Sequence, residues 1–110
     1  MTNKCILIID DEEDIREVAQ LCLEAMGGWQ VCTAQSGSQG LMKAQSQQPD
    51  AILLDVMMPD MDGLSTLEKL RANPLTKNIP VIFLTAKNNL LDPDRLAQMG
   101  VKGIIPKPFD

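Results

Sequence analysis

The chain has 110 residues, of which 45% are hydrophobic and 23% are charged, and its formal net charge is −5. This length suits one domain that buries about two thirds of its unfolded surface without covalent cross-links. The negative net charge argues against direct binding to nucleic acid.

The absence of histidine excludes Ser-His-Asp triads, Cys-His pairs and histidine metal sites. No apolar run approaches a membrane span or a signal-peptide core, so we expect a cytoplasmic protein with no membrane contact.

The three cysteines, Cys5, Cys22 and Cys32, are odd in number and lie in apolar stretches. They form no CxxC pair of the kind that binds zinc or performs redox chemistry. The pattern predicts that all three are small core residues in a reducing compartment.

Five short apolar runs, mostly of β-branched residues, predict five strands. They are Cys5–Ile9, Gln30–Ala34, Ala51–Leu54, Val81–Leu84 and Gly103–Ile105. The runs are nearly continuous rather than alternating, as expected of strands that are covered on both faces of a parallel sheet.

Helical patterns separate the predicted strands. The first helix should present one apolar face and stop at the glycines 27 and 28; the face comprises Ile15, Val18, Ala19, Cys22 and Met26. A capping box of Ser36 and Gln39 predicts a second helix, which runs through Leu41 and Ala44. The third helix carries Leu64, Leu67 and Leu70 and ends before Asn73, and the fourth extends from about residue 91 to 99, closed by Gly100.

Alternating strands and helices predict an open α/β sheet with right-handed crossovers, in one domain spanning residues 1–110. The last strand is followed only by "PKPFD". No helix follows it to cover the second face of the sheet at that edge. We therefore expect either that the chain is truncated before a final helix or that a partner covers this surface.

Polar side chains follow four of the five predicted strands. In open α/β sheets, ligands bind beyond the carboxyl ends of the strands. The first strand ends in Asp10 and Asp11, the third in Asp55, the fourth in Thr85, and the fifth, after a proline, in Lys107. The sequence thus delivers three carboxylates, a hydroxyl and an ammonium to one edge of the sheet.

Such a set of side chains is suited to Mg²⁺ and a phosphoryl group. Two carboxylates about 4 Å apart repel by roughly 4 kcal/mol at an effective dielectric near 20, and Mg²⁺ would compensate this cost while leaving positions for phosphate oxygens. Thr85 and Lys107 suit phosphoryl oxygens, and Asp55 is a candidate nucleophile. The next acids, at positions 12 to 14, are interpreted as a helix start facing a favourable dipole and as part of the solvent-exposed face.

The motifs "IIDDEE", "LLDVMMPDMDG", "VIFLTA" and "PKPF" occur in this order along the chain. Because of these four motifs, the chain resembles the response-regulator receiver domain (CheY-like) of two-component signalling over essentially all 110 residues. The resemblance implies a flavodoxin-like parallel sheet of strand order 2-1-3-4-5 with helices on both faces. The family's fifth helix is missing from this chain.

The resemblance also implies a role for each residue. Asp55 would be the phosphoacceptor, Asp11 would bind Mg²⁺ directly, Asp10 would assist, and Met57 would contribute its backbone carbonyl. Thr85 would bind the phosphoryl oxygen and shift on activation, and Lys107 would pair with the phosphoryl charge. The peptide bond from Lys107 to Pro108 is expected to be cis.

The chain departs from the family at the position three residues before the lysine. Ile104 stands there in place of the usual aromatic residue, so an aromatic ring cannot report phosphorylation. Lys87 and Met57 occupy the positions that flank the phosphoryl group in the family and tune its hydrolysis.

The partners implied are a sensor histidine kinase or histidine phosphotransfer protein, which donates the phosphoryl group, and an output protein or domain. A dimer on phosphorylation is also compatible with the resemblance. The chain would not be an enzyme beyond catalysing its own phosphorylation and dephosphorylation.

Two other functions are alternatives. A haloacid-dehalogenase-like phosphatase would carry DxD after its first strand, whereas this chain has adjacent "DD". A degenerate receiver that serves only as a scaffold would bind no Mg²⁺ near Asp11.

Overall fold

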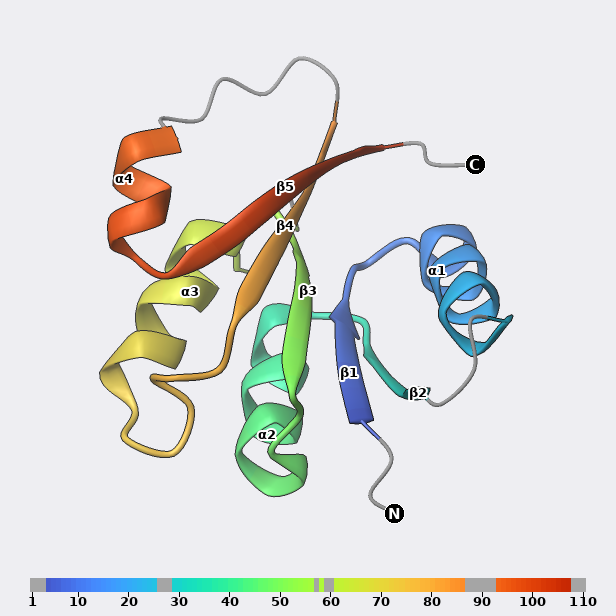
Figure 1. Cartoon of the computed structure of the whole chain (residues 1–110), viewed down its shortest axis with the longest axis horizontal. Coiled ribbons are helices and arrows are strands. Elements are labelled where there is room, and N and C mark those ends of the chain that lie inside the picture. Colours follow the sequence, from blue (N-terminus) through green and yellow to red (C-terminus); the bar gives the residue numbers. More distant parts are fainter. Residues whose placement is uncertain (1–3, 26–28, 57, 59–60, 87–92, 108–110) are drawn as a thin grey trace.

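The computed structural model describes residues 4–25, 29–56, 58, 61–86 and 93–107, apart from the side chains of residues 86, 93, 95, 106 and 107. Strands and helices alternate along the chain (Figure 1). The strands are β1 (Lys4–Ile9), β2 (Trp29–Ala34), β3 (Ala51–Asp55), β4 (Val81–Ala86) and β5 (Val101–Lys107). The helices are α1 (Glu13–Ala25), α2 (Gly37–Gln47), α3 (Gly63–Ala72) and α4 (Pro93–Gln98).

All five strands are parallel and form one sheet in the order β2-β1-β3-β4-β5. This confirms the predicted fold class and the strand order that the resemblance implied. The central β1 and β3 are in register with Ile9 opposite Leu54, so their carboxyl ends lie side by side. The edge strand β5 is longer than the predicted strand Gly103–Ile105. It also includes residues 101, 102, 106 and 107, which lie along β4.

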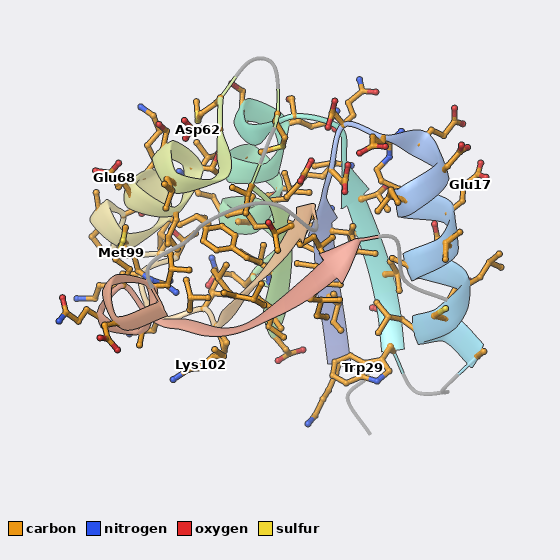
Figure 2. The ribbon with its side chains drawn as sticks, turned by 90° about the horizontal axis from the view of Figure 1, so that it is seen from above. Glu17, Trp29, Asp62, Glu68, Met99 and Lys102 are labelled. Carbon is orange, nitrogen blue, oxygen red and sulfur yellow. The ribbon has the colours of Figure 1, made fainter. Side chains whose placement is uncertain are left out.

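Helices cover both faces of the sheet, and each face has its own apolar core. On one side, α2, α3 and α4 pack through residues such as Ala44, Leu67, Leu70 and Leu96. On the other side, α1 packs through Ala19 against Ile6, Ile8, Leu53 and Leu84. Figure 2 shows the two layers from above, with Glu17 on α1 and Glu68 on α3 pointing outward on opposite sides of the sheet.

The apolar face predicted for the first helix was partly wrong. Ile15, Ala19 and Leu23, each four residues apart, pack against the sheet, whereas Val18 is 39% exposed and Cys22 is exposed. Met26 lies outside the described residues. The predicted and observed faces overlap at Ile15 and Ala19, because residues three and four positions along a helix both lie within about 60° of the starting residue. The apolar pattern therefore did not tell which side of this overlap meets the sheet.

The expectation that all three cysteines are core residues was also wrong. Cys22 is on the surface, and Cys5 and Cys32 are half-buried.

The face of the sheet that α1 covers is not closed along its whole width. Ala51, Ile82 and Ile105 belong to this apolar face but are only half-buried. The expectation that either the chain is truncated before a final helix or a partner covers this surface stays a prediction, like the assignment of residues 1–110 to a single domain. No helix within the described ranges is long and apolar enough to span a membrane.

The helix ends follow the local rules largely as predicted. Ser36 accepts a hydrogen bond from the backbone of Gln39 at 3.1 Å, and the Gln39 side chain accepts one from the backbone of Gln35 at 2.7 Å. The reciprocal bond of the expected capping box thus reaches one residue further back than usual. The helix α3 ends at Ala72, before Asn73, as predicted, and α4 begins at residue 93, with residues 91 and 92 outside the described part.

Arg71, near the end of α3, ties this helix to the turn between α4 and β5. Its guanidinium donates hydrogen bonds of 2.7 to 3.2 Å to four backbone carbonyls, those of Lys77, Ile79, Met99 and Gly100. Partial burial lowers the pKa of Arg71. Gly100 has a φ of 85°, which L side chains rarely adopt, so this position favours glycine, and an added Cβ would also lie 2.9 Å from a guanidinium nitrogen of Arg71.

We expect Arg71→Met to lower the free energy of unfolding by about 2–4 kcal/mol, because hydrogen bonds from a charged donor contribute more than neutral ones and the carbonyls would lose their partner. Urea unfolding followed by circular dichroism measures this change. The matched control is Lys69→Met, on the exposed surface of the same helix, which should change stability by no more than about 0.5 kcal/mol. Equal effects of the two substitutions would contradict a bracing role for Arg71.

Candidate metal and phosphoacceptor site

Two buried aspartates lie at the adjoining carboxyl ends of β1 and β3. Asp10 follows β1 and is 0% exposed, and Asp55 is the last residue of β3 and is 1% exposed. The register that pairs Ile9 with Leu54 places the two aspartates next to each other. The backbone N–H of Asp10 donates to Ala34 on β2 at 3.1 Å, which holds the strand end in the sheet.

Four carboxylates gather at this point. Asp10, Asp11, Glu12 and Asp55 each contribute one oxygen, and these oxygens all lie within 4.8 Å of one another. Asp10 and Asp55 are buried, while Asp11 and Glu12 are exposed. The cluster therefore has an inner, water-excluded side and an outer side open to solvent.

The donor set fits a hard divalent cation. All four groups offer oxygen, with no sulfur or imidazole, and such a set suits Mg²⁺, Ca²⁺ or Mn²⁺ rather than zinc or copper. Two like charges 4.8 Å apart repel by about 3.5 kcal/mol at an effective dielectric of 20. A bound cation would remove this cost, and the exposed side leaves room for waters and for oxygens of a phosphoryl group.

The turn after β1 is shaped by Asp10. Its Oδ1 accepts a hydrogen bond of 2.9 Å from the backbone N–H of Glu12, and its carbonyl accepts one of 2.7 Å from Arg16 Nη1 on α1. This turn brings the Glu12 carboxylate back to the cluster. The sequence interpretation of Glu12 as helix start and solvent face missed that proximity, which the adjacent acids in "DDEE" could have suggested.

The segment after β3 is fixed by close backbone contacts. Val56 donates to Leu84 on β4 at 3.0 Å, and Gly63 donates to Val56 at 2.8 Å. Asp62 caps α3 by accepting from Ser65 at 2.7 Å. The start of α3 is thus packed directly against the strand end that carries Asp55. Met57, expected to offer its carbonyl to the metal, lies outside the described residues.

Thr85 and Lys107 lie on the neighbouring strand ends. Asp55 pairs with Leu84, the residue before Thr85, and Thr85 is 7% exposed. Lys107 pairs with Ala86 through the backbone. The side chain of Lys107, the bond from it to Pro108, and Lys87 lie outside the described residues. Ile104, at the position that is usually aromatic, is 40% exposed.

A parallel five-stranded sheet of order 2-1-3-4-5, with a buried aspartate inside a carboxylate cluster at its carboxyl edge, defines the class of CheY-like phosphoacceptor domains. The family model for the response regulator receiver domain matches residues 6–110. The chain belongs to this family of two-component signalling domains.

Curated relatives agree with this assignment. The chain is 40% identical over 107 residues to the alkaline phosphatase synthesis transcriptional regulatory protein PhoP of Bacillus subtilis, a match that covers 97% of this chain and 43% of that protein. It is 37% identical over 105 residues to a probable chemotaxis protein CheY of Rhizobium etli, covering 94% of this chain and 81% of that protein. The chain therefore spans less than half the length of the Bacillus relative.

Solved structures agree as well. The N-terminal domain of a response regulator receiver protein from Methanoculleus marisnigri superposes with a TM-score of 0.84 at 39% identity, covering 94% of this chain and 84% of that one. Chemotaxis protein CheY4 of Vibrio cholerae superposes with a TM-score of 0.85 at 29% identity, covering 99% and 90%.

Proposed function

We propose that this domain accepts a phosphoryl group on Asp55 from the phosphohistidine of a sensor kinase or histidine phosphotransfer protein, in a reaction that requires Mg²⁺. The observation that carries the proposal is the position of Asp55, which is buried at a strand end and contributes one oxygen to the group of four carboxylates. The absence of histidine from the chain is consistent with an acceptor rather than a donor.

In the proposed reaction, an Asp55 carboxylate oxygen attacks the phosphorus as the bond from phosphorus to the donor nitrogen breaks, which yields an acyl phosphate. Asp11 and Asp10, with the Met57 carbonyl, would hold Mg²⁺, which neutralises phosphoryl charge when it is bound. The burial of Asp55 keeps bulk water from the nucleophile before transfer.

The neighbouring strand ends would bind the transferred group. The Thr85 hydroxyl would donate a hydrogen bond to a phosphoryl oxygen, and the Lys107 ammonium would pair with its negative charge. Because Thr85 is almost buried at the end of β4, a shift of its hydroxyl toward the phosphoryl group would change the adjoining surface. In this chain such a change would act without an aromatic ring at position 104.

The domain would then switch its affinity for an output protein or domain, with dimerisation as one form of output. Several relatives are transcriptional regulators more than twice as long as the matched segment. Any contact with DNA would belong to a separate region, because the net charge here is −5. The domain would catalyse only its own phosphorylation and dephosphorylation.

Incubation with acetyl phosphate and Mg²⁺ should add one phosphoryl group, measured by intact-protein mass. Asp55→Asn should abolish the adduct, and omission of Mg²⁺ should reduce it strongly. The control Asp14→Asn removes an exposed carboxylate from the first turn of α1 and should leave labelling unchanged. A labile adduct that persists in Asp55→Asn would refute the assignment.

A further inference from the structure

Two thiols from different strands meet on the α2 side of the sheet. The Sγ atoms of Cys5 on β1 and Cys32 on β2 are 3.6 Å apart. Both residues are half-buried, so small ions and reagents can approach them. Cys5 precedes Asp10 by five residues along β1, a distance of about 16 Å, so this pair is separate from the carboxylate cluster.

Polar groups lie next to each of the two cysteines. Cys32 Sγ is hydrogen-bonded to the side-chain oxygen of Gln47, the last residue of α2. Asp50 makes two hydrogen bonds to the backbone of Cys5. The Asp50 carboxylate accepts one of 2.7 Å from the Cys5 N–H, and the Asp50 N–H donates one of 2.8 Å to the Cys5 carbonyl. The Gln47 oxygen thus lies beside one of the two sulfurs, and the Asp50 carboxylate holds the backbone of Cys5.

The strand register disfavours a disulfide between these cysteines. Cys32 is opposite Leu7, two residues along from Cys5. With a strand spacing of about 4.8 Å and a rise of about 3.3 Å per residue, the two Cα atoms are roughly 8 Å apart. Cysteines whose Cα atoms are more than about 7 Å apart cannot be bridged without movement of the backbone.

The same sulfur spacing matches a shared metal ion. Zinc–sulfur bonds of about 2.3 Å in tetrahedral geometry place two sulfurs about 3.8 Å apart, close to the 3.6 Å observed. We propose that Cys5 and Cys32 form a two-thiolate site for one thiophilic divalent cation of the zinc class, with the Gln47 oxygen and water as further ligands. Each sulfur would release its proton to solvent as its bond to the metal forms.

Without metal, Cys5 is held in the thiol form. Burial, the neighbouring Cys32 thiol and the Asp50 charge raise the pKa of Cys5 to about 11. A raised pKa makes a thiol a poor nucleophile toward oxidants and alkylating agents. A cation would stabilise both thiolates, in the way that metal binding deprotonates thiol ligands generally.

Cobalt(II) tests the proposal, because it replaces zinc and a thiolate–cobalt bond gives a near-ultraviolet charge-transfer band that carboxylates do not give. The reduced full chain is titrated with Co²⁺ in excess Mg²⁺, which occupies the carboxylate cluster. We expect one bound cobalt with this band in the unmodified protein and in Cys22→Ser, whose thiol is remote and exposed. Cys5→Ser and Cys32→Ser should each weaken binding by more than the roughly 10–100-fold that loss of an outer-shell partner costs.

A second measurement needs no variant. Zn²⁺ should slow the alkylation of Cys5 and Cys32, but not of Cys22, by iodoacetamide at a pH and reaction time at which all three thiols react in the metal-free protein, as read from peptide masses. The proposal is overturned by absence of the band at saturating Co²⁺, by a band that survives Cys5→Ser or Cys32→Ser, or by equal alkylation of all three cysteines with and without Zn²⁺. Ready formation of a Cys5–Cys32 disulfide under a mild oxidant would contradict the inference that the two Cα atoms are too far apart for a disulfide.

Discussion

Asp10→Asn should stabilise the metal-free domain and at the same time remove its stabilisation by Mg²⁺. In the absence of a cation, Asp10 and Asp55 are two buried like charges whose oxygens lie within 4.8 Å of each other. Asparagine removes one charge but keeps an Oδ1 that can accept the hydrogen bond from Glu12. We expect the free energy of unfolding in a chelator to rise by about 1–3 kcal/mol, which is part of the repulsion that Coulomb's law gives at this separation.

With Mg²⁺ present the order of stability should reverse. Mg²⁺ at 1,000 times its dissociation constant stabilises the native state by about 4.1 kcal/mol, which is more than Asp10→Asn gains without metal, and this stabilisation requires the intact carboxylate set. Urea unfolding of the unmodified protein, Asp10→Asn and Asp14→Asn, each with chelator and with Mg²⁺, measures both effects. Asp14→Asn should behave like the unmodified protein. A domain that serves only as a scaffold would show no Mg²⁺ effect in any of the three.

Gly63→Ala should destabilise the domain and impair phosphorylation together. A Cβ at this position would lie 2.5 Å from the carbonyl oxygen of Asp55 and 2.7 Å from Cα of Val56. Both neighbours are backbone atoms, so the clash cannot be relieved by rotating a side chain. The start of α3 must then move away from the strand end that carries the phosphoacceptor. We expect a loss of about 3 kcal/mol, at the upper end of the cost of overpacking.

The matched control is Gly103→Ala on β5, where an added Cβ meets nothing within 4 Å. It should keep stability within about 0.5 kcal/mol and leave the rate of labelling by acetyl phosphate unchanged. For Gly63→Ala, the labelling rate should fall even at urea concentrations where the variant is fully folded. A variant that loses stability but labels at the normal rate would show that the contact supports the fold and not the position of Asp55.

Much of the fold could be predicted because its signals are local. Continuous β-branched runs mark strands that are buried on both faces, and the polar residue after a run identifies the strand end, as at Asp10 and Asp55. The motif resemblance added the strand order, which the structure confirms. The cluster of Asp10, Asp11 and Asp55 was predicted on the same basis, since parallel strands bring their carboxyl ends to one edge.

Other features depend on packing and could not be predicted from spacing. The side of α1 that meets the sheet was predicted only in part, because the structure turns Leu23 toward the sheet together with Ala19 and leaves Val18 and Cys22 exposed. Glu12 joins the carboxylates only because the turn held by Asp10 folds its side chain back. The hydrogen bonds from Arg71 to two loops could not be predicted either, because the acceptors are backbone carbonyls, which every residue carries.

The sequence by itself determined the class of fold, the position of each strand along the chain and the chemical character of the site, because apolar runs and the charges that follow them act over a few residues. Only the tertiary structure decided which distant groups share a site. The thiols of Cys5 and Cys32 are 27 positions apart in the chain and 3.6 Å apart in space, and Gly63 lies against the backbone of Asp55. Such contacts are set by strand register and helix packing, and these depend on the whole sheet.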